Sequence, residues 1–100
     1  MKLQQGDVIL RDIDKIPDGS EIQDNLILAY GSATGHKHQI IAGKAELWLK
    51  DDKMYLSVLS DSVKLVHDEH KSITILQGNW SVTKVMEYDH FAEEAREVRD

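Results

Sequence analysis

The stretch from residue 46 to residue 59, ELWLKDDKMYLSVL, carries the clearest structural signal in the chain. Two apolar runs, at 46–49 and 54–59, flank a charged segment at 50–53. Strand-forming runs separated by a short polar segment are typical of a β-hairpin. The stretch therefore predicts an antiparallel β protein.

The apolar residues on either side of this hairpin also form short runs that turn signals separate. The segment IPDGS at 16–20 supplies a proline and a glycine for a turn, and GSATG at 31–35 predicts a loop of small residues. The tripeptide QGN at 77–79 predicts another turn before the last strand. The predicted strands, all within 7–88, include 8–10, 26–30, 38–42, 63–66, 72–76 and 80–88. We expect a compact antiparallel β-barrel or two-sheet sandwich.

In the C-terminal segment, the spacing of apolar residues changes from the alternation of a strand to that of a helix. Phe91, Ala95 and Val98 are spaced four and three residues apart, and Asp89 can cap a helix that starts there. The pattern predicts a short C-terminal α-helix over about 89–99. Because no repeat or linker interrupts the sequence, we expect a single domain over 1–100.

Composition excludes several classes of function. The chain has 18 acidic and 12 basic residues, and a net charge of -6 argues against binding nucleic acid through the phosphate backbone. The absence of cysteine excludes disulfides, thiol catalysis and Cys-based zinc sites. No apolar stretch approaches the roughly 20 residues that cross a bilayer, and the first residues lack a signal-peptide pattern. We expect a cytoplasmic protein without membrane contacts.

Four of the five histidines occur in two close pairs, GHKH at 35–38 and HDEH at 67–70. If the first pair lies on a strand, His36 and His38 project from the same face. His67 and His70 can point in one direction only if the chain bends between them, and the polar Asp68 and Glu69 favour such a bend.

Three or four neutral imidazoles suit zinc, nickel, iron(II) or copper. The pairs therefore predict a divalent transition-metal site with His36, His38, His67 and His70 as its ligands. Asp68 or Glu69 could orient a ligand or act as a base. One interpretation is an enzyme that hydrolyses or modifies a small molecule.

Other interpretations stay open at this point. The histidines could be hydrogen-bonded loop residues that bind no ligand, or a metal-free acid and base pair. The chain could also be a non-enzymatic binding or assembly module of phage or mobile-element origin. Such a module would act through a protein partner or as a homo-oligomer. His90, near the predicted helix start, is expected to be a surface residue.

At the level of motifs, the chain resembles an uncharacterised family of small bacterial and phage proteins. The resemblance covers QGDV at 5–8, LAYG at 28–31, TGHKH at 34–38, HDEH at 67–70 and the strand from Gly78 to Tyr88. It implies no activity. The site alone is similar to that of the metal-binding cupins through the His-x-His at 36–38, although the chain lacks the second cupin motif and its first acid after the pair, Glu46, is distant. A cupin-like site would be completed here by His67 or His70.

Overall fold

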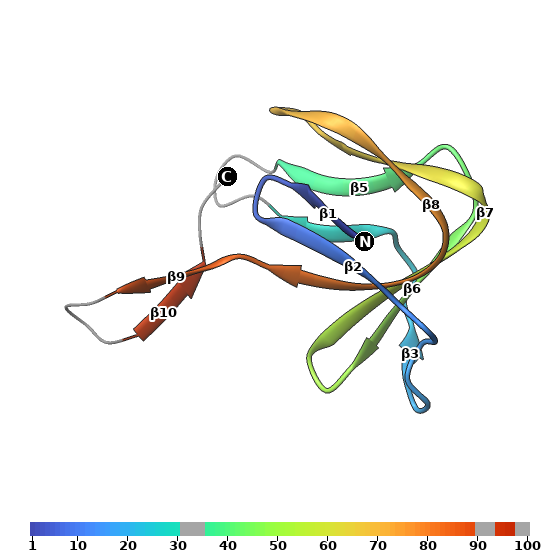
Figure 1. The fold of residues 1–100 in the computed structure, drawn as a ribbon, viewed down its shortest axis with the longest axis horizontal. Coiled ribbons are helices and arrows are strands. Elements are labelled where there is room, and N and C mark those ends of the chain that lie inside the picture. Colours follow the sequence, from blue (N-terminus) through green and yellow to red (C-terminus); the bar gives the residue numbers. More distant parts are fainter. Residues whose placement is uncertain (31–35, 90–93, 98–100) are drawn as a thin grey trace.

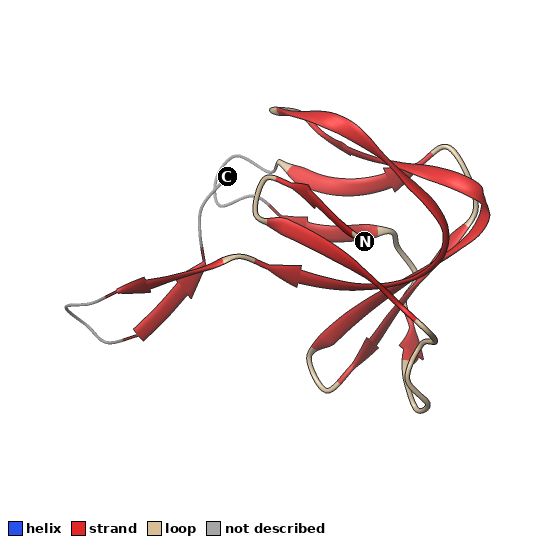
Figure 2. Cartoon of the chain, viewed as in Figure 1, coloured by secondary structure: helices blue, strands red, loops and turns tan. Residues whose placement is uncertain are grey.

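The computed structural model describes residues 1–30, 36–89 and 94–97, with side chains for 1–30 and 36–85. This part of the chain is mainly β and contains only strands and loops (Figure 2). None of its elements is a helix long and apolar enough to cross a membrane. The strands are β1 (Lys2–Gln5), β2 (Val8–Ile13), β3 (Glu21–Ile22), β4 (Ile27–Tyr30), β5 (Lys37–Ile41), β6 (Ala45–Lys50), β7 (Lys53–His67), β8 (His70–Lys84), β9 (Met86–Asp89) and β10 (Glu94–Glu97).

Eight strands form one antiparallel sheet that curls into a half-barrel (Figure 1). The long hairpin of β7 and β8 lies at the centre of this sheet. The strand order along the main path is β1-β2-β8-β7-β5-β4. The edge of β7 that faces away from β8 is shared, because β6 pairs with its first part and β5 with its last part. The curled antiparallel sheet confirms the predicted mainly β class. Of the two predicted architectures, barrel and two-sheet sandwich, the half-barrel is closer to the barrel.

The hairpin predicted at 46–59 is confirmed as the β6–β7 hairpin. Leu49 faces Met54 and Lys50 faces Lys53 across the two strands. Asp51 and Asp52 form the turn, and both have positive φ angles, 50° and 63°. Two positive φ angles match the right-handed twist of paired strands, and aspartate tolerates them better than most residues.

The turn predicted at 77–79 is wrong. Residues 70–84 form one continuous strand, β8, in which Gly78 has a φ of 138°. A glycine inside a strand permits such a backbone conformation without interrupting the ladder. The two short strands predicted at 54–59 and 63–66 are also one strand, β7, whose pairing with β8 shifts register between Val58 and Ser62.

The core lies inside the curl and consists mainly of aliphatic side chains from β2, β4 and β5 to β8. Trp80 is a buried aromatic member of this core, and its indole N–H donates a hydrogen bond to the carbonyl oxygen of Leu76. His38 is one of the largest fully buried side chains, although it is polar. The buried apolar residues are Val8, Ile9, Leu10, Leu28, Ala29, Ile40, Leu47, Leu56, Val58, Val63, Leu65, Ile75, Trp80 and Val82.

The structure does not show the predicted C-terminal helix. Glu94–Glu97, inside the range predicted as helical, form β10 and pair with β9 as a two-stranded sheet that extends away from the half-barrel (Figure 1). The helix prediction depended on three apolar residues in one short segment. A helix of that length is marginal in water unless its apolar face packs on other elements. Residues 90–93 and 98–100, including His90, Phe91 and Val98, lie outside the described residues.

Candidate functional site

The second histidine pair lies on either side of a tight turn. β7 ends at His67 and β8 begins at His70, and the two residues face each other across the hairpin. Asp68 and Glu69 form the turn between them. The bend that lets His67 and His70 point in one direction is therefore a hairpin turn. It brings the two rings to a centroid distance of 4.6 Å.

The first pair reaches the same place because β5 runs beside the end of β7. Gln39 of β5 pairs with Val66 of β7, so that His38 and His67 are near neighbours on adjacent strands. Their ring centroids are 4.3 Å apart. His36, just before β5, lies 5.7 Å from His67, and His38 lies 5.8 Å from His70. The structure thus gathers all four paired histidines in one group, called the histidine cluster below.

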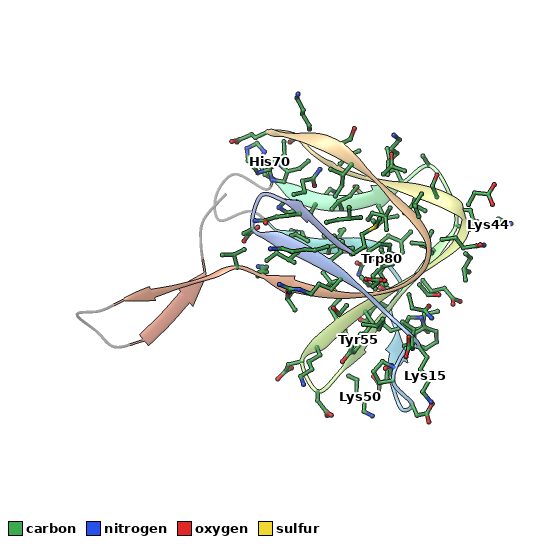
Figure 3. The ribbon with its side chains drawn as sticks, viewed as in Figure 1. Lys15, Lys44, Lys50, Tyr55, His70 and Trp80 are labelled. Atoms are coloured by element: carbon green, nitrogen blue, oxygen red, sulfur yellow. The ribbon has the colours of Figure 1, made fainter. Side chains whose placement is uncertain are left out.

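The cluster lies at one end of the molecule. Figure 3 shows His70 at the tip of the β7–β8 hairpin, far from Lys15 and Lys50 at the opposite end. Its members differ in burial, since the His38 ring is fully buried while the His36 side chain is 27% exposed. The cluster therefore runs from the core to the surface.

The two turn carboxylates contact the outermost ring. Nδ1 of His36 lies 3.2 Å from Oδ2 of Asp68, and its Nε2 lies 3.1 Å from Oε1 of Glu69. A carboxylate only accepts hydrogen bonds, so that both contacts are hydrogen bonds when the ring carries two protons. Asp68 and Glu69 therefore hold His36 against the turn from the solvent side. The roles predicted for these acids, orienting a ligand or acting as a base, both stay predictions.

The innermost ring is held by Gln5. Nδ1 of His38 lies 2.9 Å from Oε1 of Gln5, in a buried contact. The amide nitrogen of Gln5 donates two further hydrogen bonds, to the carbonyl oxygens of Leu65 at 2.9 Å and Lys71 at 2.8 Å. Gln5 thus ties β1 to both strands of the β7–β8 hairpin and to β5.

A buried carboxylate faces the other nitrogen of the same ring. Oδ1 of Asp7 lies 3.5 Å from Nε2 of His38, and the Asp7 side chain is only 7% exposed. Asp7 belongs to the turn between β1 and β2, where Gly6 has a φ of 57°. Its backbone carbonyl accepts a hydrogen bond from the amide of Val85 at 2.8 Å, which fixes the turn against the end of β8.

The donor atoms of the cluster are not arranged around one point. Nδ1 of His67 accepts a hydrogen bond from the backbone N–H of Glu69 at 3.0 Å, which leaves Nε2 as the protonated nitrogen of a neutral ring. Within residues 1–30 and 36–85, no group of three or more His, Asp or Glu side chains has the geometry to hold a metal ion as it stands. A shared ion would require the rings to rotate.

Sequence reasoning found the histidines but missed Gln5 and Asp7. Both precede the first apolar run, and their residue types are common in exposed turns. Their role follows from the pairing of β1 with β2 and of β2 with β8, which places the first turn of the chain beside His38. The motif QGDV at 5–8 was one signal, since it formed part of the family resemblance.

Fold and site together define a small half-barrel β protein with a histidine cluster at one end of its long hairpin. The chain belongs to a family described as a domain of unknown function, DUF8820, whose model matches residues 4–85. This match confirms the predicted resemblance to an uncharacterised family. It covers the half-barrel except the first part of β1, includes every residue of the cluster, and ends just before β9. No curated protein and no solved structure matches the chain.

Proposed function

We propose that the histidine cluster binds one divalent transition-metal ion, of the group zinc, nickel, iron(II) and copper. The observation that supports this is the meeting of four imidazoles from two segments about thirty residues apart, with neighbouring ring centroids between 4.3 and 5.8 Å. Histidine is the commonest metal ligand among side chains. The alternative of hydrogen-bonded loop histidines that bind no ligand accounts for the contacts of His36 with Asp68 and Glu69, but a loop position does not account for the burial of His38 and His67.

The spacing of the rings suits a shared ion. With metal–nitrogen bonds of about 2.0–2.1 Å and a tetrahedral angle, the centroids of two ligating imidazoles lie about 5 Å apart. The four observed separations bracket this value, so that rotation about the side-chain torsions could converge the rings without moving the strands. His67 would then exchange its hydrogen bond from Glu69 for the metal.

The surroundings of the cluster suggest what such an ion would do. An ion held by three histidines keeps an open position and lowers the pKa of a bound water, which makes a nucleophile for hydrolysis. Glu69 and Asp68 lie on the exposed side of the cluster, with side chains 59% and 80% exposed. They are placed to orient His36 or to accept a proton near that open side, as in an enzyme that hydrolyses or modifies a small molecule.

Elemental analysis of the untagged protein, followed by calorimetric titration with zinc and nickel, tests the proposal. We expect one equivalent of metal per chain. His70→Ala and His36→Ala should each weaken the affinity at least tenfold. Lys37→Ala is the matched control, because Lys37 lies between the two histidines and is exposed. Background metal content together with no heat of binding would refute the proposal.

A second function is favoured by a different observation. β9 and β10 pair only with each other among the described strands and extend away from the half-barrel. An isolated two-stranded hairpin is marginally stable in water, and docking on another chain would stabilise it. We therefore propose assembly into a homo-oligomer, or with a protein partner, as the alternative function. Light scattering of the full chain with and without EDTA tests it, and a monomer in both conditions would argue against it.

A further inference from the structure

We infer that the first turn of the chain completes the site: Gln5 fixes the tautomer of His38, and Asp7 supplies a carboxylate ligand beside its Nε2. The inference deepens the proposed function and rests on it for the identity of the ligand. It assigns the inner end of the metal site to His38 and Asp7, and leaves the outer positions to the other histidines.

The orientation of the Gln5 amide follows from its partners. Its nitrogen lies within hydrogen-bond distance of two backbone carbonyl oxygens, which can only accept. A reversed amide would place an oxygen against both of them. Oε1 must therefore face His38, so that Nδ1 of His38, 2.9 Å away, carries a proton and donates it. This leaves Nε2 as the nitrogen that can bind a metal.

The other side of the ring faces a carboxylate. Nε2 of His38 lies 3.5 Å from Oδ1 of Asp7, and both side chains are buried. A ring nitrogen and a carboxylate oxygen that face each other in this way can both bind one divalent ion.

The distance also fits two ligands of one ion. Nitrogen and oxygen donors with bonds of about 2.0–2.2 Å to a tetrahedral ion lie about 3.4 Å apart. The observed separation of 3.5 Å is close to that value without any movement of either side chain. A hydrogen bond from the far ring nitrogen to a fixed acceptor, here Gln5, is the usual support of a metal-ligating histidine.

The set of donors has a chemical consequence. Imidazole nitrogen and carboxylate oxygen suit zinc, iron(II) and nickel, whereas copper(I) prefers sulfur ligands. The negative charge of Asp7 further favours a divalent ion over a monovalent one. We therefore assign the site to a divalent ion bound by a mixed nitrogen and oxygen set, with Asp7 and His38 as its buried part.

Nitrogen-15 NMR of histidine-labelled full-length protein tests the tautomer. We expect Nδ1 of His38 to carry a proton both in EDTA and after zinc is added, and Nε2 to move to the shift of a metal-bound nitrogen. An unprotonated Nδ1 in EDTA would overturn the assignment to Gln5, whether or not the protein binds metal. Zinc ligation through Nδ1, or zinc binding that leaves Nε2 unchanged, would overturn the placement of the ion.

Zinc affinity tests Asp7 separately. We expect Asp7→Asn to weaken zinc binding 10- to 100-fold, while Asp61→Asn, the same change at an exposed position of β7, leaves it unchanged. Equal affinities in wild type and Asp7→Asn would overturn the role of Asp7 and leave the proposed function standing. No zinc binding by the wild type would instead refute the proposed function. If Asp7→Asn does not fold, the Nε2 shift in the wild-type protein still decides the placement.

Discussion

Replacing Gln5 with leucine should strongly destabilise the protein. Leucine has a similar volume, so the change creates little cavity, but it removes three hydrogen bonds. The carbonyl oxygens of Leu65 and Lys71 lose a donor, and Nδ1 of His38 loses its acceptor. At about 1–3 kcal/mol for each buried group left without a partner, less where water enters, we expect a loss of about 3–5 kcal/mol. For a domain of this size, that corresponds to a fall in Tm of roughly 10–30 °C.

Urea denaturation followed by tryptophan fluorescence, in EDTA so that metal does not contribute, measures this loss. Gln4→Leu is the matched control: it makes the same change one residue earlier, where the side chain is exposed and donates to the carbonyl oxygen of Gly6. The control should change the free energy of unfolding by no more than about 0.5 kcal/mol. If the two variants differed by less than about 1 kcal/mol, the reasoning that Gln5 ties the strands together would be wrong.

Two further predictions concern the scaffold. Gly43→Ala should cost about 1–3 kcal/mol, because a Cβ at this position would lie 2.5 Å from both the hydroxyl oxygen of Ser60 and the carbonyl oxygen of Ser62; an unchanged urea midpoint would contradict this. The second concerns Asp12, whose pKa is held below its ordinary value of 3.8 by a hydrogen bond from the Met1 ammonium group and by the charge of that group. A carboxyl resonance of Asp12 that titrates at the ordinary value would argue against the contact. Because the folded pKa is the lower one, the stabilisation from this contact is present at neutral pH and is lost as pH falls through the folded pKa.

The sequence predicted the local structure well where one hairpin contained the whole signal. Residues 46–59 hold both strands and the turn of the β6–β7 hairpin, so that their pairing needed no knowledge of the rest of the chain. The turn predicted at Gly78 was wrong because a glycine can serve either as a turn or as a permissive position in a long strand. The surrounding ladder between β7 and β8 decides between the two, and that ladder is not visible in the local sequence.

The sequence predicted only the part of the candidate site that lies within short motifs. The histidines stand out because their pairs are close in sequence, and the need for a bend at Asp68 and Glu69 follows from strand geometry alone. Gln5 and Asp7 reach His38 only through pairings of β1, β2 and β8, which join residues more than sixty positions apart. No spacing rule within one short motif could have found them.

The unequal burial of the first histidine pair divides the site into two kinds of position. His36 is held by exposed acids at the rim, while His38 is fully buried and contacts Gln5 and Asp7. A relative could lose or change His36 and keep its fold, whereas losing His38 would require its buried neighbours to change at the same time. Within this family, the inner residue should therefore vary together with Gln5 and Asp7, whereas the outer one should be constrained by binding and not by folding. Sequence differences at position 38 would therefore report on folding, and differences at position 36 would report on binding.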